Sequence, residues 1–121
     1  MIVVDTSVWI EHLRTGGSPL GQALVAGHVL GHAFVIGELA CGNLRNRAEI
    51  LALLRELPEA PVAEHDEVLA FIDLHHLTGI GIGWIDAHLL AATCLVGARL
   101  WTRDRALREA ARISGVALMP G

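Results

Sequence analysis

The pattern of hydrophobic and polar positions begins with a short apolar run, residues 2–4, which stops at Asp5. A continuous run of β-branched residues is typical of a strand buried on both faces of a parallel sheet. Asp5 would then lie at the carboxyl end of a central strand, where ligands of open α/β sheets gather. Thr6 or Ser7 can cap the helix that follows, so Asp5 is either a cap itself or the first member of a site. Apolar spacing predicts the inward face of that helix: Val8, Trp9, His12 and Leu13.

The rest of the chain alternates between short strands and helices. Ser18 followed by Pro19 is typical of a helix start, and Gly27 of its end. The predicted helices cover residues 19–26, 34–41, 48–57, 85–96 and 104–112, with one more after residues 64–66. The predicted strands cover residues 29–30, 62–63, 98–101 and 116–118. The apolar positions predicted to face inward in two of the helices are Ile50, Leu53, Leu54 and Leu57, and Val68, Leu69 and Ile72.

This alternation predicts an α/β sandwich with a central, mainly parallel sheet. A chain of 121 residues fits one compact domain, residues 1–121. The glycine-rich segment at residues 79–83 is predicted to be a flexible loop. It is not a dinucleotide-binding fingerprint, because no GxGxxG pattern follows a strand there.

The composition is apolar, at 53% hydrophobic residues with a mean hydropathy of +0.50, so we expect some apolar surface to meet a partner or a second copy. The longest uninterrupted apolar stretch, residues 89–98, is too short to span a bilayer. We expect no signal peptide, because no basic region precedes the first apolar run. Cys41 and Cys94 lack zinc-ligand spacing, so we predict two buried free thiols and a cytoplasmic location.

Four acidic residues stand out by position: Asp5, Glu38, Asp86 and Asp104. Helix capping is an alternative role for Asp86 and Asp104, which stand at the starts of predicted helices. Glu38 lies among apolar residues, where a carboxylate is usually paired or bound to a metal. Clustered carboxylates repel one another unless a cation joins them, and an all-oxygen ligand set favours Mg²⁺ or Mn²⁺. Together the four residues indicate a divalent-metal site.

The charge balance fits such a site. The formal net charge is −4, so removing the four acids leaves 0, and two divalent ions would cancel their charge. Thr102 precedes Asp104 by two residues and can orient a carboxylate, although the role of an ordinary strand residue is equally open. His88 follows Asp86 by two residues, but such positions diverge on a helix. We therefore place His88 at the edge of the site or in the core.

The chain contains no lysine, and five of its nine arginines lie between residues 99 and 112. Arg105, Arg108 and Arg112 follow one face of the last predicted helix, beside Arg103. This stripe is either a solvated helix face or a phosphate-contacting surface for RNA next to the acidic site. Three tryptophans are predicted to be core residues rather than platforms for stacked bases: Trp9, Trp84 and Trp101.

Taken together, these motifs resemble the PIN-domain ribonucleases and, more narrowly, the VapC toxins of bacterial toxin–antitoxin pairs. The resemblance covers essentially the whole chain, and all four acidic positions of the family pattern are occupied. No single motif is specific, but the ordered quartet is. The matching motifs are Asp5-Thr6-Ser7 after a strand, Glu38-Leu39 followed by Gly42, Asp86 opening an alanine-rich helix, and residues 100–104, Leu-Trp-Thr-Arg-Asp.

The resemblance implies a PIN-like α/β/α sandwich, a homodimer, and inhibition by a cognate VapB-type antitoxin. It also implies Mg²⁺- or Mn²⁺-dependent cleavage of RNA, in which activated water attacks the phosphodiester and leaves 5′-phosphate and 3′-hydroxyl ends. The implied catalytic and metal-binding residues are Asp5, Glu38, Asp86 and Asp104, supported by Thr6, Ser7 and Thr102.

Two other classes of protein stay open. A receiver-like phospho-acceptor domain also combines acids at strand ends with Mg²⁺. Receivers resemble one another in having a lysine near the site, and this chain has none. A non-catalytic binding module with the PIN fold would differ from the enzyme in lacking metal-dependent RNA cleavage.

Overall fold

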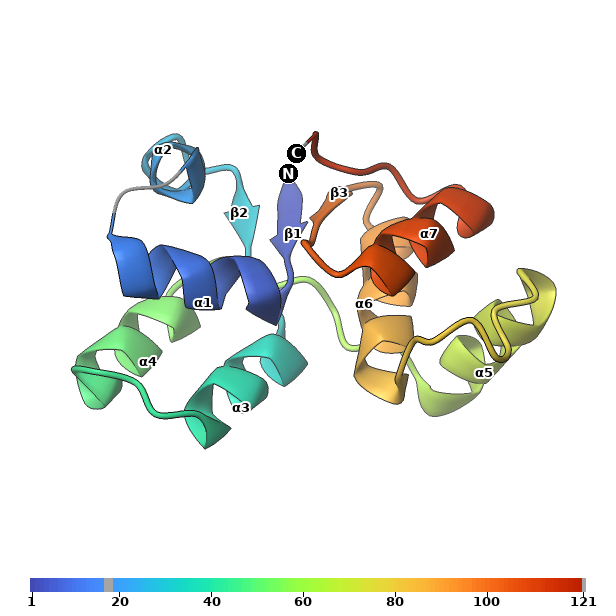
Figure 1. Cartoon of the computed structure of the whole chain (residues 1–121), viewed down its shortest axis with the longest axis horizontal. Coiled ribbons are helices and arrows are strands. Elements are labelled where there is room, and N and C mark those ends of the chain that lie inside the picture. The colour runs from blue at the N-terminus through green and yellow to red at the C-terminus, as the bar shows by residue number, and fades with distance from the viewer. Residues whose placement is uncertain (17–18, 121) are drawn as a thin grey trace.

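The computed structural model describes residues 1–16 and 19–120 and arranges them around a short sheet (Figure 1). The strands of this part of the chain are β1 (Ile2–Val4), β2 (Val29–Leu30) and β3 (Arg99–Trp101). Its helices are α1 (Thr6–Thr15), α2 (Pro19–Val25), α3 (Ala33–Cys41), α4 (Arg47–Arg55), α5 (His65–Leu74), α6 (Trp84–Leu95) and α7 (Arg105–Ser114). Ser18, predicted to cap the second helix, lies outside the described residues.

The sheet has the strand order β2-β1-β3, and both pairs are parallel. Ile2 faces Val29 on one side and Arg99 on the other, so β1 is the central strand. Its Val3 and Val4 side chains are 0% and 1% exposed. Burying a side chain of this size contributes about 1.5–3 kcal/mol. The central strand predicted from the first apolar run is therefore confirmed.

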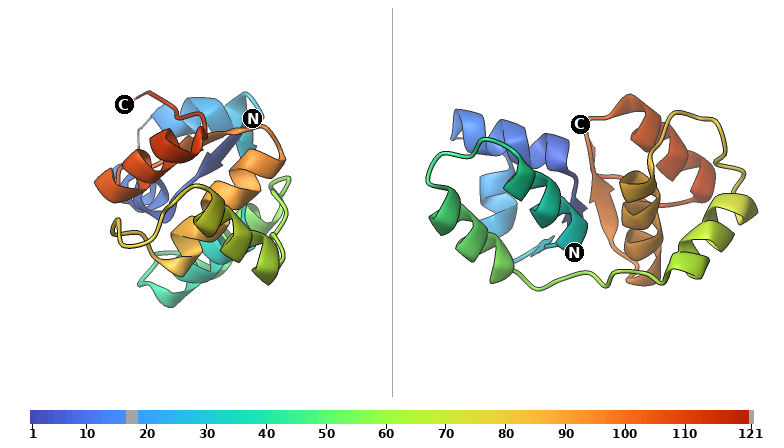
Figure 2. Two further views of the ribbon diagram at one scale, coloured as in Figure 1. Left: turned by 90° about the vertical axis from the view of Figure 1, so that its right-hand side faces the viewer. Right: turned by 90° about the horizontal axis from the view of Figure 1, so that it is seen from below.

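Helices cover the sheet on both sides, as Figures 1 and 2 show. Helices α1 to α4 lie on the side of β2, where α1 packs against α2 and α3, and α3 against α4. Helices α5 to α7 lie on the opposite side, where α6 contacts both β1 and β3. This arrangement confirms the predicted α/β/α sandwich with a parallel sheet. In the described part of the chain no helix is both long and apolar enough to cross a membrane.

The strand predicted at residues 62–63 is absent. The chain meets the sheet edge earlier, where Glu59 forms a single parallel bridge with Gly31. The segment after β2 turns into α3 at Ala33, so no strand partner continues along this edge to residue 62.

The strand predicted at residues 116–118 is reduced to one contact with the sheet. Leu118 bridges Leu100 in parallel. The Leu100 N–H donates to the Ala117 carbonyl at 2.8 Å, and its carbonyl accepts from the Met119 N–H at 2.9 Å. This bridge fixes Leu118 beside β3, next to the last helix.

Two leucines predicted to face inward lie on the surface instead. Leu53 is 55% exposed and Leu69 is 43% exposed. Their neighbours Leu54 and Val68 are buried at 5% and 0% exposure. Successive residues of a helix point about 100° apart, and each of these helices buries a narrow stripe that only one member of each pair can join.

The predictions for the cysteines and for one tryptophan are also wrong. Cys41 ends α3 and Cys94 lies near the end of α6, and both thiols are exposed because these helix ends extend beyond the packed core. Trp84 is 39% exposed because it is the first residue of α6. Trp9 and Trp101 are buried, as predicted.

His88 lies in the core, between two aromatic rings. Its ring centroid lies 4.6 Å from that of Phe34 and 4.7 Å from that of Trp84. Nearby, the buried His32 caps α3, because its Nδ1 accepts a hydrogen bond from the Phe34 N–H at 3.0 Å. Burial, with a smaller effect of His88, lowers the pKa of His32 to about 4. Burial, followed by the effect of His65, also lowers the pKa of His88, so both rings pack as neutral groups at physiological pH.

Candidate active site

Asp5 lies where β1 ends and α1 begins, at the position that caps the helix. Its side chain makes no capping hydrogen bond. Instead its Oδ2 accepts hydrogen bonds from Ser7 Oγ at 2.8 Å and from Thr102 Oγ1 at 2.7 Å. The side chain of Asp5 is buried and is held in one orientation by two hydroxyl groups. Of the two roles left open by the sequence, the capping role of this side chain is excluded.

Thr6 and Ser7 do not cap α1, contrary to prediction. Asp5 occupies the cap position, so both residues belong to the first turn of the helix. Their hydroxyls donate to acidic side chains instead, Thr6 Oγ1 to Glu38 Oε1 at 2.7 Å and Ser7 Oγ to Asp5. The first turn of α1 therefore links the acid of β1 to the acid of α3.

Thr102 connects the ends of the two neighbouring strands. It is fully buried and directly follows β3. Its hydroxyl donates to Asp5 and accepts a hydrogen bond from the Asp104 N–H at 3.0 Å. A hydrogen bond to a charged acceptor contributes about 1.5–3 kcal/mol. Thr102 is thus more than an ordinary strand residue, because it orients one of the four acids and the backbone of another.

Glu38 faces solvent, although its sequence neighbours are apolar. Val35 and Leu39 occupy the buried face of α3 at 2% exposure each, and Glu38 points away from that face. Its bond from Thr6 agrees with the expectation that a carboxylate in this segment is paired.

Asp86 and Asp104 both stabilise helix starts. Oδ2 of Asp86 accepts from the Gly83 N–H at 3.0 Å, before α6. Oδ1 of Asp104 accepts from the Leu107 N–H at 2.9 Å, in the first turn of α7. The capping role that the sequence left open is therefore present at both residues, and it occupies one oxygen of each carboxylate.

The four acids lie close enough to repel one another. The pKa of Asp86 is raised, first by burial and then by the negative charges of Asp5, Asp104 and Glu38. The hydrogen bond from Gly83 opposes this rise. Within residues 1–16 and 19–120, no arginine forms an ion pair with any of the four acids. Among the described residues, their mutual repulsion is therefore not compensated by an arginine ion pair.

Each of these carboxylates keeps one oxygen free of hydrogen bonds within the described chain. The four free oxygens are Asp5 Oδ1, Glu38 Oε2, Asp86 Oδ1 and Asp104 Oδ2. In their present positions, no three acidic, histidine or cysteine side chains among the described residues are grouped as ligands of one ion. A cation at this place would have to draw the free oxygens together.

The arginines beside the acids differ in their pairing. Arg103 forms an ion pair with Glu11. Arg112 donates to both oxygens of Glu109, at 2.5 and 2.6 Å. Arg108 Nη1 donates weakly to the Thr102 carbonyl at 3.4 Å, and no bond to Arg105 occurs in the described part of the chain. The predicted stripe is thus not uniform, because Arg105 and Arg108 are the members without an acidic partner.

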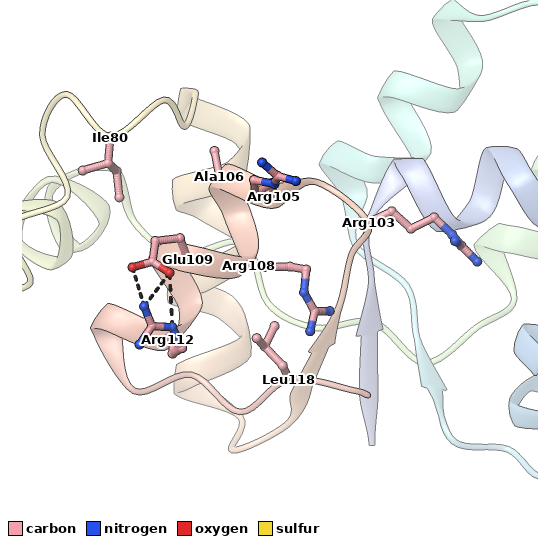
Figure 3. Close-up of a pocket in the computed structure, with 8 residues that line it drawn as sticks. All are labelled: Ile80, Arg103, Arg105, Ala106, Arg108, Glu109, Arg112 and Leu118. Atoms are coloured by element: carbon pink, nitrogen blue, oxygen red, sulfur yellow. Dashed lines mark hydrogen bonds and ion pairs between the residues drawn. The ribbon is translucent and has the colours of Figure 1, made fainter. Parts of the chain in front are cut away.

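This part of α7 borders a cavity of about 930 Å³ (Figure 3). The sequence analysis missed four of its lining residues: Ile80, Ala106, Glu109 and Leu118. They come from three separate segments, so no local pattern could group them. Arg103 extends away from the other lining side chains, toward α1 (Figure 3).

A second concave surface, which we call the α1–α3 groove, has a volume of about 630 Å³. Glu38 lies in its wall, together with polar residues of the segment after α3. Its apolar lining residues are Ile10, Leu13, Leu39, Leu44 and Ile50. Ile10 is 50% exposed. An apolar residue at an outward position of the first predicted helix is the signal of this groove that the sequence contains.

The parallel α/β/α fold and the order of the four acids along the chain are those of a PIN domain. The profile of the PIN domain matches residues 2–113, so the chain belongs to the PIN-domain family. It is 50% identical over 119 residues to ribonuclease VapC32 of Mycobacterium tuberculosis, an alignment that covers 98% of this chain and 96% of that protein. The protein of the same name from a second strain matches to the same extent. The resemblance to the VapC ribonucleases is thereby confirmed.

We predict that Asp86→Asn raises the melting temperature of the metal-free protein by a few degrees. The amide oxygen can still accept from the Gly83 N–H, whereas the repulsion from the other acids is removed. The variant should also lose most of the stabilisation that Mg²⁺ gives the native chain. Thermal melts in EDTA and in Mg²⁺ measure both effects.

Glu67→Gln is the matched control for this prediction, because Glu67 Oε1 accepts from the Glu64 N–H at 2.9 Å at the start of α5. It has the same capping geometry but lies beside Glu64 and Asp66 instead of the other acids of the site, so its response to Mg²⁺ should equal that of the native chain. A lower melting temperature for Asp86→Asn with an intact response to Mg²⁺ would leave Asp86 with a capping role alone.

Proposed function

We propose that this protein is a metal-dependent endoribonuclease and the toxin of a toxin–antitoxin pair. The observation that carries the proposal is the acidic quartet, in which one oxygen of each carboxylate is fixed by the protein and the other is uncommitted. The 50% identity to a protein named ribonuclease supports the activity. Cleavage of cellular RNA in the cytoplasm is the corresponding biological role.

The residues present fit a hard divalent cation. The proposed ligands are all carboxylate oxygens, which Mg²⁺ and Mn²⁺ prefer. The pKa of Asp86 is raised first by burial and then by the charges of the other three acids, and no described arginine is paired with these acids. We propose Asp5, Glu38, Asp86 and Asp104 as the ligands. When bound, the cation would activate water and stabilise the leaving oxygen.

The remaining polar residues of the site orient these ligands. Thr102 and Ser7 hold Asp5 through its Oδ2, so the free Oδ1 is presented in one direction. Thr6 does the same for Glu38. Hydrogen bonds to ligating carboxylates commonly tune activity by about 10–100-fold. Hydrolysis would add water across the P–O3′ bond and leave 5′-phosphate and 3′-hydroxyl ends.

We predict that Asp5→Asn lowers RNA cleavage by at least about 100-fold while the fold survives, because one ligand charge is removed and the shape is kept. Cleavage by the native chain should stop in EDTA and return with Mg²⁺ or Mn²⁺. Gel assays on RNA, with mapping of the product ends, measure this.

Asp73→Asn is the control, since Asp73 is an exposed acid on α5. Cleavage that persists in EDTA, or a fully active Asp5→Asn variant, would contradict the metal-site proposal. If purified protein binds RNA without cutting it under any metal, the non-catalytic binding module becomes the better description.

The two arginines without an acidic partner are proposed to hold RNA phosphates. We predict that replacing both Arg105 and Arg108 by Gln flattens the salt dependence of RNA binding, with a slope change of about 0.7 for each phosphate that is no longer neutralised. Arg112→Gln should change the slope less, because Glu109 already neutralises that guanidinium. Binding titrations at several salt concentrations measure the slopes, and equal slopes for all variants would show a merely solvated helix face.

A VapB-type antitoxin is the proposed partner of the α1–α3 groove, and a homodimer is the proposed state of the free protein. The groove combines apolar side chains with the carboxylate of Glu38. It therefore suits an amphipathic segment whose apolar face fills the groove and whose arginine or lysine pairs with the acids.

We predict that Ile10→Asp abolishes inhibition by the protein encoded beside this chain, because it places a charge in the apolar groove, and leaves RNA cleavage intact. Ile113→Asp is the control, since Ile113 is 46% exposed on α7 and does not line the groove. Inhibition assays with the two variants measure the effect, and equal inhibition of both would reject the groove as the binding site. Light scattering tests the dimer; a monomer at micromolar concentration would contradict it.

A further inference from the structure

The pocket on α7 is an open concave surface lined by one helix face and two other segments (Figure 3). Its floor is one face of α7, on which Arg105, Arg108, Glu109 and Arg112 follow helical spacing. Ile80, from the loop of residues 79–83, and Leu118, from the segment after α7, form its sides. In Figure 3 the Glu109–Arg112 pair lies on the side of Ile80, and Arg108 lies on the side of β3.

The loop that carries Ile80 is packed directly on α7. Gly81 has φ +94°, a conformation that favours glycine, and a Cβ on it would lie 3.5 Å from the Cβ of Ala106. The same loop ends at Gly83, whose N–H holds Asp86. The wall of the cavity and one acid of the candidate active site are therefore parts of one short segment.

A second connection joins the cavity to the acids. Arg108 donates to the carbonyl of Thr102, and the hydroxyl of Thr102 donates to Asp5. The cavity thus adjoins the candidate active site through the start of α7 as well as through the loop. An RNA strand with one phosphate at the acids would carry a neighbouring nucleotide to this cavity.

The lining chemistry suits a nucleotide better than a phosphate alone. A site for phosphate would gain nothing from Ile80, Ala106 and Leu118, and the charge of Glu109 would oppose binding. A volume of about 930 Å³ is also much larger than a phosphate needs. Unpaired RNA bases stack on aromatic rings or on guanidinium planes, and they are bound by hydrogen bonds to their edges. The lining offers guanidinium planes beside apolar side chains.

The adjacent carboxylate and guanidinium select among the bases. Guanine offers two acceptors, O6 and N7, which match an arginine, and donors at N1 and N2, which match a carboxylate. The other three bases do not offer both pairs. Arg112 and Glu109 now satisfy each other in an exposed ion pair, which contributes little to stability and is readily exchanged for a ligand.

We propose that the α7 cavity binds one unpaired guanine nucleotide of the RNA substrate. Glu109 accepts from the N1 and N2 groups of the base, Arg112 donates to O6 and N7, and Arg105 and Arg108 hold the flanking phosphates. This assignment rests on the proposed action on RNA and specifies the sequence preference of the same site.

The test combines changes to individual groups of the base with single substitutions in the protein. Four short unstructured RNA oligomers are compared. The first carries one guanosine. In the other three, this guanosine is replaced by inosine, which lacks the N2 amine, by 7-deazaguanosine, which lacks N7, or by adenosine. Binding to the cleavage-deficient Asp5→Asn chain is measured by fluorescence anisotropy in EDTA. Each replacement should weaken binding by about five- to tenfold.

Each substitution in the protein should abolish the loss of affinity for only one of the modified bases. In Glu109→Ala, inosine should bind as well as guanosine while 7-deazaguanosine keeps its penalty; in Arg112→Ala the reverse should hold. Arg55→Ala, which changes an exposed arginine on α4, is the control and should keep both penalties. Equal affinity for all four oligomers, or penalties that persist in both variants, would overturn the guanine assignment and leave a phosphate contact only.

Cleavage of the same oligomers by the native chain with Mg²⁺ separates the two proposals. Cleavage without a preference for guanosine would overturn the base assignment and keep the ribonuclease. Guanosine-dependent binding without cleavage would overturn the ribonuclease and keep the nucleotide site.

Discussion

The parallel pairing of β1 with β3 is the constraint on which the candidate site depends. Val4 lies opposite Trp101, so the next residues of the two strands, Asp5 and Thr102, leave the sheet at the same edge. The hydrogen bond of 2.7 Å between their side chains is the direct result. Thr102 is fully buried. Loss of the Asp5 acceptor would therefore leave the Thr102 O–H donor unsatisfied in the protein interior, which would lower the free energy of unfolding.

In the proposed site, helix capping is compatible with ligand binding. Asp86 and Asp104 each use one oxygen to stabilise a helix start, and Thr6 and Thr102 take one oxygen from Glu38 and Asp5. A carboxylate held through one oxygen has little rotational freedom, so its second oxygen is presented in a defined direction. The same bonds that build the fold thereby orient each carboxylate, but among the described residues the acids are not yet grouped as ligands of one ion.

The basic side chains near the acids are kept apart from them by other partners. Glu11 holds Arg103, Glu109 holds Arg112, and the Thr102 carbonyl accepts from Arg108. A direct arginine–carboxylate pair would neutralise the acids and close the site. The arrangement instead leaves the four acids beside a pocket that is lined by arginines.

The sequence by itself predicted most of the elements and singled out the four acids by position. An unbroken β-branched run defines β1, and apolar spacing defines most of the helices, because both patterns depend on local geometry. The surface positions of Leu53, Leu69, Trp84 and the two cysteines depended on which neighbour covers each helix, which apolar spacing does not encode. Only the tertiary structure brought Thr102 to Asp5, across 97 positions of sequence, and Ile80, Glu109 and Leu118 into one cavity. Interactions of that range are fixed by strand order and loop packing, and no local pattern of residues contains either.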